Sequence, residues 1–299
     1  MSQEQPFAVL VPYYSNLAYL RLTLESVLRQ SDPHWWCAVV DDSPDAAGVA
    51  ELVAELGDAR LGYVRNEANL GVAGNFNRCF ELAAERGAEL AVILHADDLV
   101  EPEYVATMRE VHRCHPEAGC VAPKVTVIDS EGRPYLPLPD RVKAWLWPDR
   151  LDRLHGERGL RLLLRGQFFH CPAVSYRVAL IEHPAWDQRW SQVMDLMLYG
   201  RVLLGGGTIV LESRSVYRYR RHAASETQVN SVTLARTIEE TAAANELASA
   251  ARQLGWRRAA WAGRLRLTIR LQSVLQAVRA LVRGRLRLCW RALLLAVRP

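Results

Sequence analysis

Two adjacent aspartates follow an apolar run, in a position where they could hold a cation. The run 90–94 (LAVIL) leads within four residues to His95, Asp97 and Asp98. An apolar run of this length, ended by polar residues, predicts a strand that is buried on both faces. Ligands of open α/β sheets bind beyond the carboxyl ends of such strands, and carboxylates there suit a hard cation such as Mg²⁺. An acidic turn exposed to solvent is the alternative for these residues alone.

Polar clusters also follow two earlier apolar runs of the chain. Residues 7–11 lead to Pro12, Tyr13 and Tyr14, and residues 36–40 lead to the pair Asp41-Asp42. If the three runs are parallel strands, their carboxyl ends lie on one edge of a sheet. We therefore expect the three clusters to face one another there.

The elements that would position these clusters alternate between strand and helix. The apolar spacing predicts strands near 7–11, 36–40, 61–64 and 90–94, with helices near 17–30, 45–56 and 76–83 between them. This order predicts βαβ units around a mostly parallel sheet with right-handed crossovers.

The middle of the chain is harder to interpret. A helix over 102–112 and strands over 120–128, 166–176 and 208–211 are expected, and the pattern becomes helical from Leu234. Residues 133–150 contain four prolines and two tryptophans, which favours a loop or lid.

The composition is that of an ordinary globular protein, in which 50% of the 299 residues are hydrophobic and 23% are charged. The six cysteines match no zinc or redox spacing. The polar start lacks a secretory signal, and no uncharged run is long enough to cross a membrane. A cytoplasmic location is expected.

Charge is distributed very unevenly along the chain. No Asp or Glu follows Glu246, whereas twelve arginines do, so residues 1–246 have a net charge of −8 and the remainder is strongly basic. The four-residue spacing from Arg279 to Arg291 predicts one face of a helix, with leucine, valine and Trp290 on the rest. A basic amphipathic helix suits the surface of an anionic membrane, although packing on the body or on a partner subunit would also fit. No nucleic-acid partner is expected, because no recognition module accompanies the charge.

Taken in order, the clusters resemble those of family 2 glycosyltransferases, which are inverting enzymes of the GT-A fold. The resemblance extends over residues 7 to about 222. The motifs that carry it are Pro12 to Ser15, Asp41-Asp42-Ser43, Asn69 to Asn75, His95 to Asp98, and Met194 to Arg201.

The resemblance implies a role for each matching residue. Asp195 matches the base that deprotonates the acceptor hydroxyl, and His95, Asp97 and Asp98 would hold a divalent metal, Mn²⁺ or Mg²⁺. The residues implied in nucleotide-sugar binding are Pro12, Tyr14, Asp41, Asp42, Asn69, Gly71, Asn75, Asp97, Arg221 and His222. Two positions depart from the family pattern, because His95 and Met194 stand where acidic residues are usual.

The implied function is transfer of a hexosyl or deoxyhexosyl group from a nucleotide-diphosphate donor to a hydroxyl acceptor, with inversion, in cell-surface glycan or polysaccharide assembly. Residues 1–230 would form the catalytic domain and 231–299 a basic helical extension, peripheral on a membrane that carries a lipid-linked acceptor. The alternative is a catalytically inactive scaffold at the membrane surface that binds nucleotide sugars. A nucleotidyltransferase fits less well, because residues 13–16 are not a glycine-rich phosphate loop.

Overall fold

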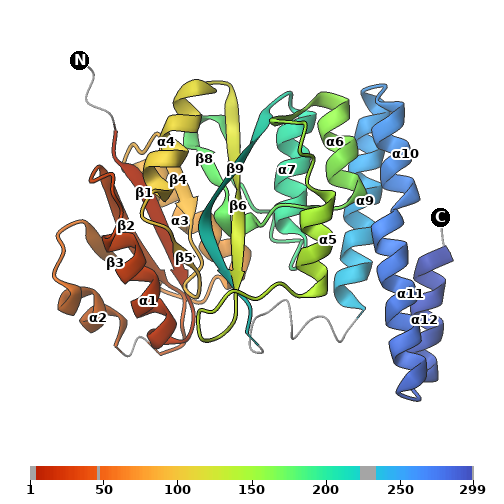
Figure 1. Ribbon diagram of the computed structural model, residues 1–299, viewed down its shortest axis with the longest axis horizontal. Helices are drawn as coiled ribbons and strands as arrows, with labels where there is room; N and C mark the ends of the chain where they lie inside the picture. The colour runs from red at the N-terminus through yellow and green to blue at the C-terminus, as the bar shows by residue number, and fades with distance from the viewer. Residues whose placement is uncertain (1–4, 46–47, 223–233, 298–299) are drawn as a thin grey trace.

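The computed structural model describes residues 5–45, 48–222 and 234–297. It has an α/β fold in which helices cover both faces of one mixed sheet (Figure 1). The elements are β1 (Phe7–Tyr13), α1 (Leu17–Leu28), β2 (Trp35–Asp41), α2 (Val49–Leu56), β3 (Leu61–Arg65), α3 (Gly71–Glu85), β4 (Leu90–Ile93), β5 (Leu99–Val100), α4 (Tyr104–Cys114), β6 (Ala118–Ile128), α5 (Leu138–Leu146), β7 (Arg153–His155), α6 (Gly156–Arg165), β8 (Ser175–Arg177), α7 (Met194–Leu204), β9 (Thr208–Arg220), α9 (Ala235–Gln253), α10 (Arg257–Leu265), α11 (Leu267–Val282) and α12 (Leu286–Val297), with short 3₁₀ turns at Cys171–Ala173 and Val178–Leu180.

The described strands follow the order β3-β2-β1-β4-β8-β6-β9-β5, and β7 pairs with β9. The pairs β1–β2, β2–β3, β1–β4 and β6–β9 are parallel, whereas β8 is antiparallel to both β4 and β6. The expected parallel arrangement of the first four predicted strands is confirmed.

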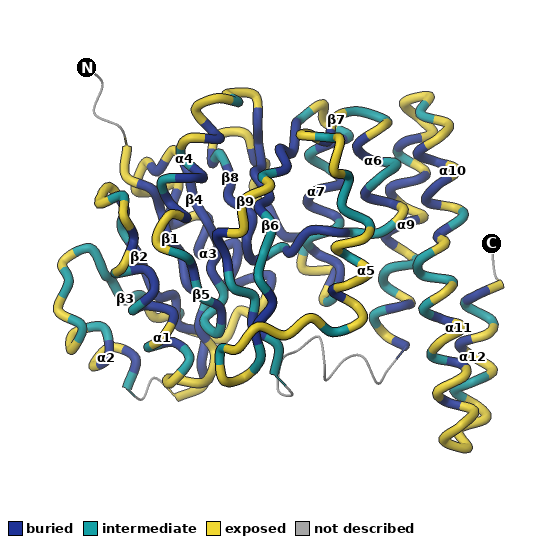
Figure 2. The backbone as a smooth tube through the Cα atoms, viewed as in Figure 1, coloured by how far each residue is buried: buried dark blue, intermediate teal, exposed yellow. Residues whose placement is uncertain are grey.

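Alternate side chains of β1 enter two separate cores. Phe7, Val9 and Val11 pack with α1, α2 and α4 on one face of the sheet. Ala8 and Leu10 belong to the core on the other face, which α3, α6, α7, α9 and α10 complete. This two-sided burial explains the unbroken apolar strands, and the dark blue centre of Figure 2 follows it.

The C-terminal helices differ in how deeply they are buried. Leu247 of α9 packs so closely on α7 that a Cβ at Gly200 would lie 2.4 Å from its Cδ2 atom, so a larger residue at position 200 would force Leu247 to move. By contrast, α11 and α12 form a hairpin with many exposed residues at the side of the molecule (Figure 2). The expected domain boundary at residue 230 lies outside the described residues.

Two expectations for the middle of the chain were wrong, and one expected strand is longer than predicted. Residues 133–150 are not entirely a loop, because they contain α5, whose prolines 137 and 139 lie at its start, where no helical N–H is needed. Of the expected strand 166–176, only residues 175 and 176 lie in a strand, within β8. The strand expected over 208–211 continues as β9 to Arg220.

The expected continuous arginine face of the tail was also wrong. Gly284, with φ of 68°, ends α11, so Arg279 lies on one helix of the hairpin and Arg291 on the other. Arg266 is not on a helix face but is buried in the turn between α10 and α11. Within the described ranges, no helix combines the length and apolar character needed to cross a membrane.

Candidate functional site

The ends of β1, β2 and β4 bring the three polar clusters together on one edge of the sheet. Tyr13 pairs with Asp41 in the parallel ladder, and the Leu94 amide donates to the Leu10 carbonyl at 2.8 Å on the other side of β1. The shared edge predicted from the sequence is confirmed. Pro12 is half-buried there, while the Tyr14 ring is 58% exposed just beyond it.

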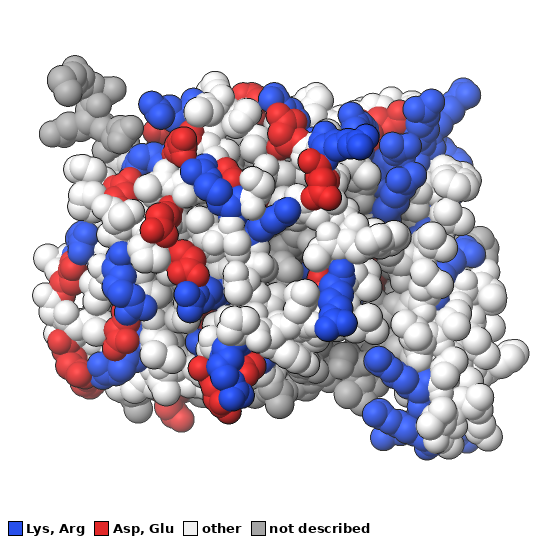
Figure 3. Space-filling model, viewed as in Figure 1, with Lys and Arg blue, Asp and Glu red and all other residues white. Residues whose placement is uncertain are grey.

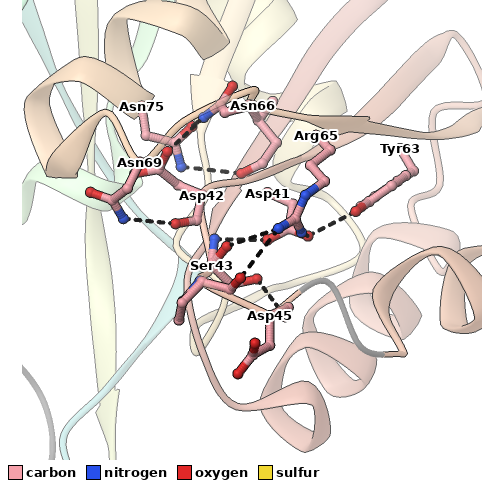
Figure 4. Close-up of polar contacts among 11 residues, drawn as sticks. Asp41, Asp42, Ser43, Asp45, Tyr63, Arg65, Asn66, Asn69 and Asn75 are labelled. Carbon is pink, nitrogen blue, oxygen red and sulfur yellow. Dashed lines mark hydrogen bonds and ion pairs between the residues drawn. The ribbon is translucent and has the colours of Figure 1, made fainter.

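Asp42 organises the loop between β3 and α3 (Figure 4). Its buried carboxylate accepts hydrogen bonds from the Asn66 side chain at 2.9 Å and from the Leu70 and Gly71 amides at 2.8 and 3.0 Å. The Asn69 side chain donates to the Asp42 carbonyl at 2.8 Å. Gly71 has φ of 70°, a conformation that glycine adopts without strain. Asp42 therefore shapes the edge that borders the site.

Asp41 is held by groups that the sequence analysis did not identify. Its carboxylate accepts from the Ser43 amide at 2.9 Å, from the Tyr63 hydroxyl at 2.8 Å and from Arg65 at 3.2 Å (Figure 4). Tyr63 and Arg65 belong to β3, so applying the strand-end rule to that strand as well would have found Arg65. The pKa of Tyr63 is raised, by burial first and then by its hydrogen bond to Asp41.

Asn75 lies inside α3 and is buried, so it does not cap that helix. Its Nδ2 donates to the Val40 carbonyl at 3.1 Å, and its Oδ1 accepts from Asn66 at 3.1 Å. The first contact ties α3 to β2, and the second ties it to the residue that follows β3. Asn75 thus helps to position the loop between β3 and α3 that Asp42 organises.

His95, Asp97 and Asp98 form a group whose ligand atoms lie within 4.8 Å of one another. Asp98 is fully buried, and its two oxygens accept from the Tyr217 hydroxyl at 2.8 Å and from the Arg220 amide at 2.6 Å. Burial, followed by the nearby Asp97 charge, raises the pKa of Asp98 well above its usual value. Asp98 therefore fastens the end of β4 to β9.

Asp97 is the accessible carboxylate of this group, with 30% of its side chain exposed. Burial opposes its ionisation, but the hydrogen bond from His222 and the charges of His95 and His222 bring its pKa below the usual value. His222 lies 2.8 Å from Oδ2 of Asp97, and Arg220 donates to the Asp97 carbonyl at 2.7 Å. The structure thus places His222 beside Asp97, although 125 residues separate them.

The donor set of this group fits a divalent cation. Asp97 supplies an ionised, partly exposed carboxylate, and His95 supplies a ring nitrogen within the cluster. A mixed nitrogen and oxygen set favours Mn²⁺ over Mg²⁺, which prefers oxygen ligands alone. Both oxygens of Asp98 are engaged with β9, so Asp98 supports the group from its buried side.

Asp195 lies in the first turn of α7 and is half-buried. The indole Nε1–H of the buried Trp186 donates to its Oδ1 at 2.9 Å. Asn77 in turn holds the Trp186 backbone, because its Oδ1 accepts from the amide at 2.9 Å and its Nδ2 donates to the carbonyl at 2.7 Å. Trp186 and Asn77 were not identified from sequence, since their apolar surroundings indicate only core packing.

Phe76 connects the surroundings of Asp195 to the cation group. Its ring lies 5.5 Å from the His95 ring and 5.5 Å from the Trp186 ring, measured between centroids. The contact with Trp186 is edge-to-face, whereas the contact with His95 is tilted, and together they restrict the orientation of the Phe76 ring. The base candidate and the metal candidate therefore share one packed wall.

Arg221 makes an internal ion pair, a contact that the sequence did not predict. Its Nε and Nη2 donate to the two oxygens of Asp140 in α5, at 2.6 and 2.9 Å. His170 lies 3.0 Å from the same carboxylate, and burial, with the Lys143 charge, lowers the pKa of His170 to about 4. This buried group fastens α5 over the end of β9.

Comparison with known proteins identifies the family. The sequence profile of glycosyl transferase family 2 matches residues 8–183, more than half of the chain. The chain belongs to glycosyl transferase family 2. The match covers the strand-end clusters from β1 to β4 and stops before Asp195.

Curated relatives match over short segments. The chain is 36% identical over 92 residues to TuaG of Bacillus subtilis, whose name assigns it provisionally to teichuronic acid biosynthesis as a glycosyltransferase; this segment covers 30% of the chain and 35% of TuaG. An uncharacterised glycosyltransferase of Methanocaldococcus jannaschii is 31% identical over 97 residues, covering 32% of each protein. The chain thus spans about a third of the length of these relatives.

Solved structures agree on the fold over nearly the whole chain. S. aureus TarS aligns with a TM-score of 0.60 at 15% identity, over 97% of this chain and 55% of TarS. Residues 1–349 of TarS in complex with UDP-GlcNAc align with a TM-score of 0.57, over 97% and 90% of the two chains. This likeness confirms the expected GT-A-like fold.

Proposed function

We propose that this family 2 member transfers a sugar from a nucleotide-diphosphate donor to a hydroxyl acceptor with inversion, in the assembly of a cell-surface glycan or polysaccharide. The observation that carries the proposal is the meeting of Asp41, Asp42 and Asp97 on one sheet edge, with Asp195 behind the same aromatic wall. The TuaG name and the UDP-GlcNAc complex of TarS support the substrate class.

Donor recognition would use the acceptor position that remains on the buried Asp42. Each carboxylate oxygen has two lone pairs. Among the described contacts, Oδ2 of Asp42, a residue that is 5% exposed, accepts only one hydrogen bond from the protein. A nucleobase imide or a ribose hydroxyl could donate to the second. Tyr14, exposed at the same edge, offers a ring beside the base.

The diphosphate end of the donor would lie at Asp97. A divalent cation held by Asp97 and His95 would neutralise charge on the departing nucleotide diphosphate. His222 keeps the Asp97 carboxylate oriented and ionised. Arg221 would contribute by holding α5 in place rather than by free contact with phosphate, because its fork engages Asp140.

Asp195 would take the proton of the acceptor hydroxyl as that oxygen attacks the anomeric carbon. Trp186 fixes Oδ1, so the second carboxylate oxygen would receive the proton. Nucleotide diphosphate then leaves from the opposite face of the sugar, which gives inversion.

Donor stabilisation combined with hydrolysis tests the proposal. We expect UDP-GlcNAc or another nucleotide sugar to raise the Tm of the protein, more strongly with Mn²⁺ than without, and the protein to hydrolyse that donor slowly without an acceptor. Stabilisation without hydrolysis or transfer would favour the inactive scaffold. His95 and Met194 support that alternative, because they stand where acidic residues are usual. Absence of both effects across a panel of nucleotide sugars would refute the proposal.

A Trp186→Phe variant is expected to lower kcat about tenfold and leave the KM for donor unchanged. Phenylalanine keeps an aromatic ring but removes the N–H that bonds Asp195, and a hydrogen bond to a charged group is worth about 1.5–3 kcal/mol. Steady-state kinetics measures both constants. Trp190→Phe is the matched control, because the buried Trp190 N–H has no hydrogen-bond partner among the described residues. Equal kinetics in the two variants would contradict the positioning role.

Peripheral membrane attachment through the α11–α12 hairpin is part of the proposal. Arg279, Arg283, Arg285, Arg287 and Arg291 are exposed there, beside the large exposed apolar residues Leu271, Leu275, Val278, Leu281, Val282, Leu286, Trp290 and Leu293. At the lower right of Figure 3 this hairpin carries basic side chains and no acidic ones. Such a surface suits an interfacial helix pair on anionic lipid.

Sedimentation with vesicles tests the attachment. We expect the protein to bind vesicles rich in phosphatidylglycerol, to bind phosphatidylcholine vesicles weakly, and to lose affinity as salt rises. Val282→Glu, at a side chain that is 82% exposed, should reduce binding, while Leu180→Glu, at an exposed position outside the hairpin, should not. Equal sedimentation of both variants would argue against the hairpin.

A further inference from the structure

A cavity away from the strand-end site is lined by residues of the C-terminal helices α9, α10 and α11. Its volume is about 710 Å³, within the range of about 300–1,000 Å³ that small-molecule sites occupy. The residues that line it are Asn245, Ala248, Ser249, Arg252, Trp261, Arg264, Leu265 and Arg270. None of them comes from the strand ends.

The cavity wall is cationic, and the carboxylates of α9 in the described part of the chain are engaged elsewhere. Arg252, Arg264 and Arg270 converge on it from three helices, and no acidic residue follows Glu246. The acidic residues of α9 face other partners: Glu239 accepts from Ser191 and Gln192, Glu240 pairs with Arg236, and Glu246 pairs with Arg189. Within the described part of the chain, neither Arg252 nor Arg264 forms a salt bridge.

A fourth arginine lies behind the wall. Arg266 is 1% exposed, has φ of 46° in the turn between α10 and α11, and donates to Oδ1 of the lining residue Asn245 at 3.3 Å. Its pKa is lowered by burial and by the charge of Arg270. Arg266 therefore holds the side chain of Asn245 in place at the cavity wall.

We propose that this cavity binds a phosphate group. Guanidinium forks match phosphate oxygens in bidentate geometry, and the Ser249 hydroxyl adds a donor. Trp261, 63% exposed, offers an apolar face to whatever carries the phosphate. The same chemistry recognises free phosphate and the headgroup of an anionic lipid. The inference does not depend on sugar transfer, because the cavity shares no residue with the strand-end site.

Calorimetry on the full chain, at constant ionic strength, tests the site with two probes. One is inorganic phosphate, and the other is dihexanoyl phosphatidic acid below its micelle concentration. We expect Arg252→Gln/Arg264→Gln to weaken binding at least tenfold. Arg113→Gln/Arg257→Gln is the control, because it removes the same charge from exposed positions outside both the cavity and the α11–α12 hairpin and should bind as the wild type does.

The two probes distinguish the source of the phosphate. Lipid binding at least tenfold tighter than that of inorganic phosphate supports a lipid-borne group, and comparable affinities support a soluble one. The proposal is overturned if neither probe binds, or if the two double variants lose affinity equally, since that result indicates only a diffuse basic surface. Circular dichroism melting of both variants confirms that each remains folded.

Discussion

An Asp195→Asn variant is expected to lose about 10²–10⁴-fold in kcat, the contribution of a general base, while binding the nucleotide-sugar donor like the wild type. Asparagine is nearly isosteric, and its carbonyl oxygen can still accept the Trp186 hydrogen bond. The fold and the aromatic wall should therefore survive. The loss should fall on kcat because the proton is removed only during the reaction.

Two measurements separate this effect from misfolding. Donor hydrolysis, or transfer once an acceptor is known, gives kcat, and calorimetry gives donor affinity. Asp187→Asn is a suitable control, because Asp187 lies nearby in sequence but pairs with the exposed Arg189. Wild-type turnover in Asp195→Asn would show that the base lies elsewhere. The proposals for the donor site and for the cavity between α9 and α11 would be unaffected.

An Asp97→Ala variant should weaken metal-dependent binding of the nucleotide diphosphate by at least about tenfold, a loss that even outer-shell partners of a metal can produce. Asp97 is the ionised, accessible carboxylate of its group, and its removal also leaves His222 without this partner. The effect should vanish when Mn²⁺ is chelated, because both proteins then lack the cation.

The control for Asp97 is another acidic residue with a solvent-exposed carboxylate. Asp149 has 84% of its side chain exposed and only a loose 3.8 Å ion pair with Lys124, so Asp149→Ala should bind like the wild type. Calorimetry of the nucleotide diphosphate, with and without Mn²⁺, compares the three proteins. Unchanged affinity in Asp97→Ala would remove this residue from the cation site.

The sheet edge could be predicted from sequence because buried strands keep their apolar pattern and end at polar residues. The sequence therefore correctly predicted that one edge of the sheet carries Asp41, Asp42 and Asp97. Contacts between distant segments could not be predicted in this way. No local sequence pattern relates Asp98 to Tyr217, or Asp140 to Arg221, because each pair forms only when β9 joins the sheet.

The incorrect predictions can each be traced to a feature of the local sequence. Proline normally argues against a helix, but at the first positions of α5 it is tolerated, so the helix that carries Asp140 was missed. The middle of β9 exposes residues 213–215, which interrupts the apolar pattern of the strand. In the tail, the regular arginine spacing favoured one helix, whereas Gly284 permits the turn that makes a hairpin.

The bond between Asp98 and Tyr217 also has a consequence for the order of events on the ribosome. The two residues are 119 positions apart, so at about 5–20 residues per second roughly 6 to 24 s of synthesis separate them. During that interval the early strands can pair, yet the nascent chain cannot close its cation group. β9, the last strand to be synthesised, thus completes both the sheet and the cation group. A ribosome that stalls before residue 217 leaves a chain in which both are incomplete.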